Sequence, residues 1–281
     1  MQPAEIPQSI KASVAAVLEA EFGLQDAFAE AAFAEAASAE TASTSLTWQP
    51  LAIQGTTNQL WLLGSHHQTW VLRVNAPSQW AFGVNREQEM QLLVGLQQHA
   101  WAPRVIAVTP EWLLQDYCGP HLLHSPEPEE VMAMVQQMHD IHQAPVVDYD
   151  ALFTHYRELF QQHQVQPELD LLNRLTKAFD KLPACEPCLV HHDIHPGNLC
   201  LLAGKLTLID WEYGGLGNPW LELPNLHHLC DLDLQRLHQL PAFSDLSYEN
   251  FLQFFHGANE VMTGLEALWN RARALATHPS E

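Results

Sequence analysis

The chain has 281 residues, 47% of them hydrophobic, which is enough for one large domain or for two lobes with separate cores. A formal net charge of −21 with only 12 Lys and Arg residues argues against a nucleic-acid-binding surface and favours cationic small molecules as ligands. Five cysteines, an odd number, indicate free thiols rather than a disulfide framework, and the CxxC pair Cys185 and Cys188 lacks the second pair of a zinc site. The sequence shows neither a signal peptide nor an apolar run long enough to cross a membrane, so we expect a cytoplasmic protein.

The first 43 residues differ in composition from the rest of the chain. Residues 10–21 carry apolar side chains at helical spacing and are followed by Gly23, a helix stop. Residues 27–36 contain the sequence AFAEA twice, in a segment rich in Ala and Glu that has few apolar anchors. We therefore expect residues 1–43 to form a helical N-terminal extension without chemistry of its own.

The next part of the chain, residues 44–118, has the pattern of a small β-rich domain. Short apolar runs bounded by turn residues predict strands at 46–53, 59–63, 69–74, 104–108 and 112–117. A polar loop with Gly55, Thr57 and Asn58 separates the first two strands, and a helix over 84–99 carries Glu89 beside its apolar face. The pattern breaks at Gly119-Pro120, where we place the domain boundary.

The remainder, residues 119–281, is predicted to be mainly helical. Apolar residues at helical spacing predict helices at 128–141, 148–162, 168–181, 219–240 and 248–276. One β-rich stretch interrupts them between residues 189 and 213. The chain is therefore expected to combine a small β-rich lobe, a linker and a larger helical lobe that contains one hairpin.

The interrupting stretch, LVHHDIHPGNLCLLAGKLTLIDWEY, predicts a β-hairpin with Ala203-Gly204 as its two-residue turn. Residues whose numbers sum to about 407 then face each other, which brings Asn198 and Asp210 to the same open end. Asp193 lies a few residues before the first strand. Two carboxylates and an amide oxygen at one place suit Mg²⁺, with one carboxylate left over as a base.

The same residues resemble a known family. His191, Asp193 and Asn198 fit H-x-D-x-x-x-x-N, the catalytic-loop spacing of protein-kinase-like phosphotransferases, and IDWEY at 209–213 lies where that superfamily has its metal-binding Asp. The longer strings HxDxHPGN, LIDWEY and GLGNPWLEL resemble the choline kinase, thiamine kinase and aminoglycoside phosphotransferase group, and IDWEY is most similar to bacterial thiamine kinases. The likeness extends over roughly residues 46–240 and leaves the N-terminal 43 residues outside it.

The resemblance implies an α+β, two-lobed protein-kinase-like fold and an ATP- and Mg²⁺-dependent kinase. It implies that Asp193 accepts the proton of the substrate hydroxyl and that Asn198 and Asp210 are Mg²⁺ ligands. Arg73, where protein kinases have Lys, would hold the α- and β-phosphates and pair with Glu89. The remaining nucleotide contacts would come from Gly55, Thr57 and Asn58 in the phosphate loop and from Gln115, Asp116 and Tyr117 beside the adenine.

The acceptor is expected to be a small cationic alcohol. Trp211, Glu212, Tyr213 and Glu222 would form an acidic, aromatic pocket suited to an organic cation, whereas Trp220 and Trp269 are better explained as core residues. Thiamine is the first expectation, followed by choline or ethanolamine and an aminoglycoside. We expect neither a nucleic-acid nor a membrane partner.

Three alternatives compete with this interpretation. Asp, Asn, Pro and Gly are ordinary residues at hairpin ends, so the motif alone could arise by chance. A metal-dependent hydrolase would instead use His191, His192, Asp193 and His195 as a ligand cluster, although Pro196-Gly197 argues against the helix that carries many such sites. A catalytically dead kinase-like binding protein would be expected to have lost Asp193, Asn198 or Asp210, and all three are present.

Overall fold

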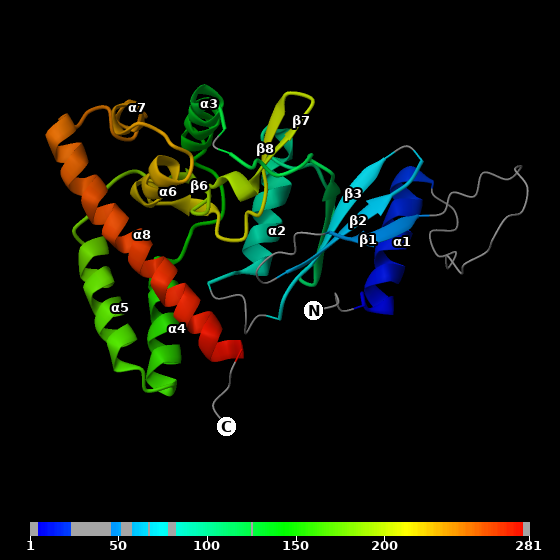
Figure 1. Ribbon diagram of the computed structural model, residues 1–281, viewed down its shortest axis with the longest axis horizontal. Coiled ribbons are helices and arrows are strands. Elements are labelled where there is room, and N and C mark those ends of the chain that lie inside the picture. The colour runs from blue at the N-terminus through cyan, green and yellow to red at the C-terminus, as the bar shows by residue number, and fades with distance from the viewer. Residues whose placement is uncertain are drawn as a thin grey trace, which may run out of the picture. The chain divides into compact units, whose positions relative to one another are not determined.

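The computed structural model describes residues 5–23, 46–51, 58–66, 68–77, 83–124 and 126–277. The chain divides into two compact units. The first comprises Met1–Ala76 and Arg104–Tyr117, and the second comprises Pro77–Pro103 and Cys118–Glu281 (Figure 1). The last break, after Tyr117, lies close to Gly119-Pro120, and the helix that carries Glu89 is grouped with the second unit.

The first unit is built on a five-stranded sheet in the order β1-β2-β3-β5-β4, in which every neighbouring pair is antiparallel. Sequence alone predicted all five strands, which are β1 (Thr47–Pro50), β2 (Gln59–Gly64), β3 (Thr69–Val74), β4 (Val105–Val108) and β5 (Trp112–Asp116). The central strand β3 alternates buried and partly buried residues at its start, as expected when one face of a sheet covers a core.

Helix α1 (Gln8–Phe22) contributes to the core of this first unit. It ends at Gly23 in the left-handed conformation, the predicted helix stop. Val14, Ala15 and Leu18 are buried in one cluster with Leu63 and Trp70 of the sheet, and Figure 1 shows the helix beside the strands. The extension expected over residues 1–43 thus contains a helix that packs against the sheet, and the AFAEA repeat lies outside the described residues.

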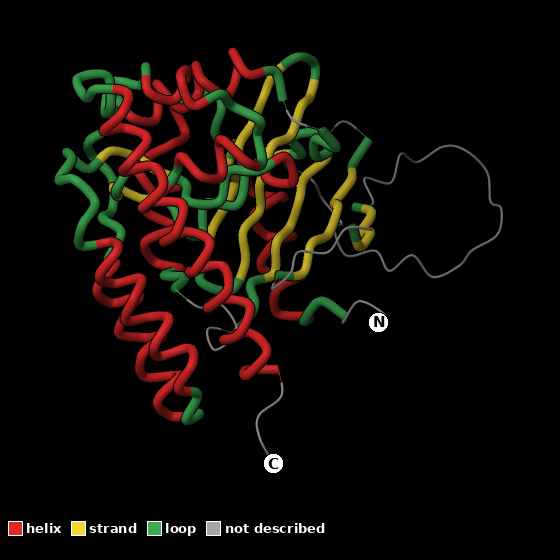
Figure 2. The backbone as a smooth tube through the Cα atoms, turned by 60° about the vertical axis from the view of Figure 1, so that its left-hand side comes forward, coloured by secondary structure: helices red, strands yellow, loops and turns green. Residues whose placement is uncertain are grey.

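The second unit is mainly helical, as predicted. Its longest helices, α4, α5 and α8, pack together through Phe153, Phe160, Leu172 and Leu268, and Figure 2 shows them side by side. The helical elements are α2 (Arg86–Gly95), η2 (Leu96–Gln98), α3 (Pro128–His139), α4 (Tyr149–Gln162), α5 (Gln166–Phe179), η3 (Pro196–Asn198), η4 (Pro219–Leu221), α6 (Leu223–His228), α7 (Leu234–His238) and α8 (Tyr248–Thr277).

The single helix predicted over 219–240 is wrong, because the chain forms η4, α6 and α7 there. Pro219 and Pro224 each lie in the first turn of a new helix, where a missing N–H costs least. Asp231 has a φ of 58°, which no α-helix accommodates, and the side chain of Asp233 caps α7 by accepting from Gln235 N at 2.6 Å.

Two short sheets complete the second unit. Strands β7 (Leu199–Leu202) and β8 (Lys205–Leu208) form the predicted hairpin with the predicted register, since Leu199 faces Leu208 and Leu202 faces Lys205. Ala203 and Gly204 have φ values of 51° and 78°, as a two-residue turn of this twist requires. Strand β6 (Cys188–Val190) pairs with β9 (Gly215–Gly217), a pairing that the sequence did not reveal.

All five cysteines lie within the described residues, and none of them forms a disulfide. Among the described helices, none is both long and apolar enough to cross a membrane.

Candidate active site

The site forms where the segment after β6 meets the open end of the β7–β8 hairpin. Ile209 N donates to Asn198 O at 2.9 Å, one step beyond the last ladder pair, and Asp210 follows directly. Asn198 and Asp210 are thereby brought to the same end of the hairpin, as the sequence predicted.

Asn198 also connects this end to Asp193. Its Nδ2 donates to the backbone oxygen of Asp193 at 2.9 Å and to Asp193 Oδ2 at 3.0 Å. Both hydrogens of the amide are thus used, and the carbonyl oxygen is left to bind a ligand. The Asp193 side chain is 42% exposed, so a substrate hydroxyl can reach it.

Asp210 has a backbone conformation that is rare for a side-chain-bearing residue. Its φ is 67°, in the left-handed region that costs an L-residue roughly 1–2 kcal/mol. Such outliers persist where neighbouring contacts enforce them, and they concentrate at functional sites. The bond from Ile209 N to Asn198 O on one side is one such contact.

His191 joins the two halves of the site through one imidazole ring. Its Nε2 donates to Ile209 O at 2.9 Å, and its Nδ1 accepts from Asp193 N at 3.2 Å. These roles require the neutral ring with its proton on Nε2. Burial lowers the pKa of His191 to about 4, which keeps the ring neutral, so this histidine braces the loop.

The buried side chain of Glu222 supports the same loop through two hydrogen bonds. The side chain is fully buried, and its two oxygens accept from His191 N at 2.5 Å and from His192 N at 3.0 Å. Burial raises the pKa of Glu222 to about 7, which shows that desolvation outweighs the two N–H donors. Glu222 was predicted in the acceptor pocket, but it is fully buried and its contacts support the loop that carries His191, His192 and Asp193.

His192 is held by a chain of hydrogen bonds. Asn218 N donates to the Tyr149 hydroxyl, and that hydroxyl lies 2.7 Å from His192 Nε2. The hydroxyl thus links the backbone N–H of Asn218 to the imidazole ring of His192. A Cβ at Gly217 would lie 2.5 Å from the Tyr149 oxygen, so only glycine leaves room for this chain.

His195 lies beside Asp193 and is a site residue that the kinase interpretation did not include. Its Nδ1 accepts from Gly197 N at 3.0 Å, which places the ring proton on Nε2, and Nε2 is 3.7 Å from Asp193 Oδ2. Contact with Asp193 raises the pKa of His195. The signal was in the sequence as the histidine of HPGN.

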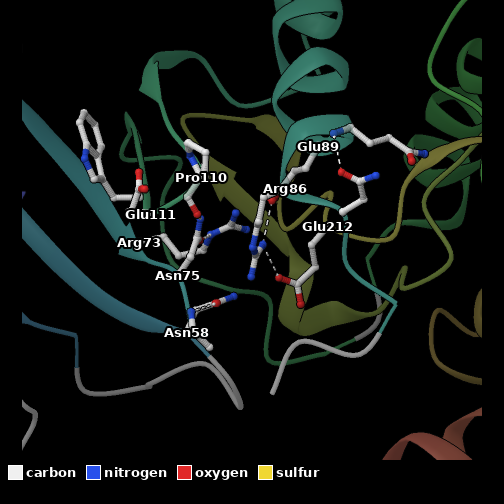
Figure 3. A network of polar contacts seen from close by, with 12 residues as sticks. Asn58, Arg73, Asn75, Arg86, Glu89, Pro110, Glu111 and Glu212 are labelled. Carbon is white, nitrogen blue, oxygen red and sulfur yellow. Dashed lines mark hydrogen bonds and ion pairs between the residues drawn. The ribbon is translucent and has the colours of Figure 1, made fainter. Parts of the chain in front are cut away.

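Arg86 is a second residue that the sequence analysis missed. Its Nη1 donates to Glu89 Oε2 at 2.8 Å and to Glu212 Oε2 at 2.9 Å (Figure 3). Both carboxylates are buried, so the arginine compensates charges that have lost most of their hydration. The predicted pairing of Arg73 with Glu89 would join the two units and stays a prediction.

Apart from Glu89, the predicted nucleotide-binding residues belong to the first unit. Arg73 is buried, with its Nε donating to Asn75 Oδ1 at 2.9 Å, and Asn58 Oδ1 accepts from Ala76 N at 3.0 Å. The N–H groups of Asp116 and Tyr117 donate to backbone oxygens of Arg104 and Thr69 and are therefore not available to an adenine. Gln115 is a buried residue of β5. Gly55 and Thr57 lie outside the described residues.

The other predicted acceptor-pocket residues occupy different environments. Trp211 is 1% exposed, and its indole N–H donates to Leu208 O at 2.8 Å, so it is a core residue. The Tyr213 hydroxyl accepts from Trp269 Nε1 at 3.1 Å, and the tyrosine is only partly buried. Glu212 is committed to Arg86. Of the four residues, Tyr213 is the one with a surface that a ligand can reach.

The ring contacts disfavour the hydrolase interpretation. The Nε2 atoms of His191 and His192 bind the Ile209 carbonyl and the Tyr149 hydroxyl, on different elements, and only His195 lies beside Asp193. Among the described residues, no three His, Cys, Asp or Glu side chains are placed to hold a metal together.

The oxygen donors suit Mg²⁺. Mg²⁺ prefers oxygen and commonly takes one or two carboxylates, completing its shell with waters and substrate phosphates. The Asp210 carboxylate and the Asn198 carbonyl oxygen are donors of this kind at one hairpin end.

Comparison with known proteins defines the family. Residues 47–268 match the model of the Phosphotransferase enzyme family, and the chain belongs to that family. Thiamine kinases of Shigella boydii serotype 4 (strain Sb227) and Escherichia coli (strain K12) are each 33% identical to it over 130 residues, covering 43% of this chain and 45% of each relative. The chain therefore spans about half the length of these curated relatives.

Solved structures show the same fold. The ethanolamine kinase of Plasmodium vivax has a TM-score of 0.61 at 13% identity, over 84% of this chain and 78% of that one. Choline kinase LicA of Streptococcus pneumoniae has a TM-score of 0.58 at 16% identity, over 82% and 85%. LicA in complex with AMP gives 0.60 at 14% identity, over 96% and 91%. The predicted kinase-like α+β fold and the family resemblance are confirmed.

Proposed function

We propose that this protein is an ATP- and Mg²⁺-dependent kinase that transfers the γ-phosphoryl group to the hydroxyl of a small cationic alcohol. The observation that carries the proposal is the grouping of Asp193, Asn198 and Asp210. The side-chain NH₂ of Asn198 donates to Asp193, and the backbone carbonyl of Asn198 accepts from Ile209, the residue next to Asp210. Family membership and the AMP complex of a structural neighbour support it.

In the proposed reaction the acceptor oxygen forms a bond to the γ-phosphorus while the bond to the ADP oxygen breaks. Asp193 takes the proton that leaves the acceptor hydroxyl. Asn198 and Asp210 would hold Mg²⁺, which when bound neutralises charge on the β- and γ-phosphates. Arg73 would bind the α- and β-phosphates, with Gly55, Thr57, Asn58 and the Gln115–Tyr117 strand end also on the nucleotide side.

Thiamine is the proposed acceptor, with choline or ethanolamine as the second candidate. The thiamine kinases share 33% identity over 130 residues, whereas the choline and ethanolamine kinases share the fold at 13–16%. Both acceptors are cationic alcohols, in keeping with a chain of net charge −21. We propose that the partly exposed Tyr213 contacts the acceptor.

An ADP-release assay with thiamine, choline, ethanolamine and kanamycin tests the function. We expect turnover with thiamine, lost when Mg²⁺ is chelated and reduced about 10²–10⁴-fold in Asp193→Asn. That variant keeps an oxygen acceptor for Asn198, and Glu266→Gln on the exposed side of α8 is the matched control. Failure of all four acceptors, or full activity of Asp193→Asn, would contradict the proposal. Calorimetric binding of ATP without turnover would favour a binding protein.

A further inference from the structure

The residue directly before the proposed base has a strained backbone. His192 has a φ of 66°, in the left-handed region that a residue with a Cβ rarely adopts. Only His191 and His192 lie between the end of β6 and Asp193, so the backbone at His192 sets the direction in which Asp193 leaves the strand. A return of this φ to the ordinary negative region would turn the chain after it by more than a right angle. The direction of the proposed base therefore depends on the contacts that hold His192 in this conformation.

Three polar contacts hold His192. Its N–H donates to Glu222 Oε1 at 3.0 Å, and its carbonyl oxygen accepts from Asn225 Nδ2 at 3.2 Å. The third contact is the shortest and involves the side chain, because Nε2 lies 2.7 Å from the Tyr149 hydroxyl oxygen. The other ring nitrogen, Nδ1, is buried and makes no hydrogen bond within the described part of the chain. Tyr149 is thus the polar group that fixes the orientation of the ring.

The side chain of Tyr149 is itself held in place. Tyr149 is the first residue of α4, so its backbone belongs to a regular helix. Its hydroxyl accepts from Asn218 N at 2.7 Å, and its ring lies against Phe179 with centroids 5.0 Å apart. A side chain that is already ordered loses little further conformational entropy when it contacts His192. The contact between the two rings is therefore an effective constraint on the loop.

We propose that Tyr149 is a positioning residue for the phosphoryl transfer, a role that rests on the kinase function proposed above. The Tyr149 hydroxyl holds the ring of His192, and the fixed ring keeps the backbone of His192 in the conformation that directs Asp193 toward the acceptor. Tyr149 does not touch the reacting atoms. Its hydroxyl matters only while residue 192 carries a Cβ that disfavours a positive φ, because glycine adopts such a φ as readily as a negative one.

A double-mutant cycle of Tyr149→Phe and His192→Gly in the ADP-release assay tests this role. In the wild-type background Tyr149→Phe, which removes only the hydroxyl, should lower kcat about three- to tenfold. It should leave the KM for ATP unchanged, because the base does not bind the nucleotide. In the His192→Gly background the same substitution should change kcat less than about twofold. Asn218 N loses its acceptor in both backgrounds, so that loss cancels. Tyr248→Phe, which removes a hydroxyl at the start of α8, is the matched control and should leave kcat unchanged.

Backbone ¹³C chemical shifts of residues 191–194 give a second measurement that needs no turnover, because they report φ and ψ. They should change in Tyr149→Phe and should agree between His192→Gly and the double variant. Unchanged shifts in Tyr149→Phe would overturn the proposal. An equal loss of kcat in both backgrounds would overturn it as well, since that is the mark of a general structural role. Failure of the wild-type chain to turn over any acceptor would instead contradict the kinase function, and the shifts would still decide whether Tyr149 holds the loop.

Discussion

Replacing Glu222 by Gln tests how the loop that carries Asp193, the proposed base, is supported. The carboxylate is fully buried and accepts from His191 N and His192 N. Glutamine has nearly the same shape but offers one oxygen and one NH₂ group, so one backbone N–H meets a donor instead of an acceptor. Leaving one buried backbone N–H without an acceptor costs about 1–3 kcal/mol, and the free energy of unfolding should fall accordingly.

The pH dependence makes this prediction sharper. The folded pKa of Glu222 is about 7, above the ordinary value of 4.5, so folding favours the protonated form. Its contribution to stability is therefore fully present below about pH 4.5 and is lost as the pH rises through about 7. The folded pKa exceeds the ordinary value by about 2.5, and this difference corresponds to a contribution of at most ~3 kcal/mol to the free energy of unfolding. Because glutamine does not titrate, the penalty of Glu222→Gln should be largest near pH 5 and should shrink by up to that amount toward pH 8.

Urea unfolding of wild type and Glu222→Gln between about pH 5 and pH 8 measures this difference. The titration of the histidines is common to both proteins and cancels, and Glu266→Gln serves as an exposed control. A penalty that stays constant with pH, or that grows as the pH rises, would refute the argument that burial governs this carboxylate.

Three further predictions concern stability. Ala203→Asn should raise the free energy of unfolding by about 0.5–1 kcal/mol, because Ala203 is exposed with a φ of 51° and asparagine tolerates that conformation better; a loss of stability in urea unfolding would contradict this. Arg86→Met should lower the free energy of unfolding by about 3–5 kcal/mol, because the Glu89 and Glu212 side chains, which are 2% and 7% exposed, lose this cation. Arg86→Lys, which keeps the charge, should recover part of that loss. His139 and His191 have folded pKa values of about 4, so the free energy of unfolding should fall as the pH drops from about 6.5 toward 4. Each histidine contributes up to ~1.4 kcal/mol per pH unit to this fall. His139→Phe removes one of the two groups and should therefore make the fall with pH less steep.

The hairpin and its site residues could be predicted because their interactions are local. A turn at Ala203-Gly204 fixes the register, and the register brings Asn198 and Asp210 together. The supporting residues act over long separations in the chain. Glu222 binds His191 across 31 positions, and Arg86 binds Glu212 across 126. No periodicity or spacing in a single sequence encodes such pairs, so only the folded chain reveals them.

The acceptor-pocket prediction shows a different limit. Aromatic and acidic residues close together in sequence suggest a cation site, but the same composition suits a core. The indole of Trp211 is directed inward to the Leu208 carbonyl, and Glu222 lies beneath the loop. The burial of each side chain distinguishes the two interpretations. That burial depends on how β6, β9 and η4 pack, which could not be predicted from the sequence.

The geometry of the proposed base depends on the charge state of a residue that does not react. The neutral ring of His191 accepts from the Asp193 N–H and donates to the Ile209 carbonyl, so it ties the loop with the base to the strand end before Asp210. A protonated ring would turn a second N–H toward the Asp193 N–H and break that tie. Burial prevents this by holding the pKa near 4. The uncharged ring of His191 therefore holds Asp193, the proposed base, at a fixed place relative to the strand end before Asp210, the proposed metal ligand.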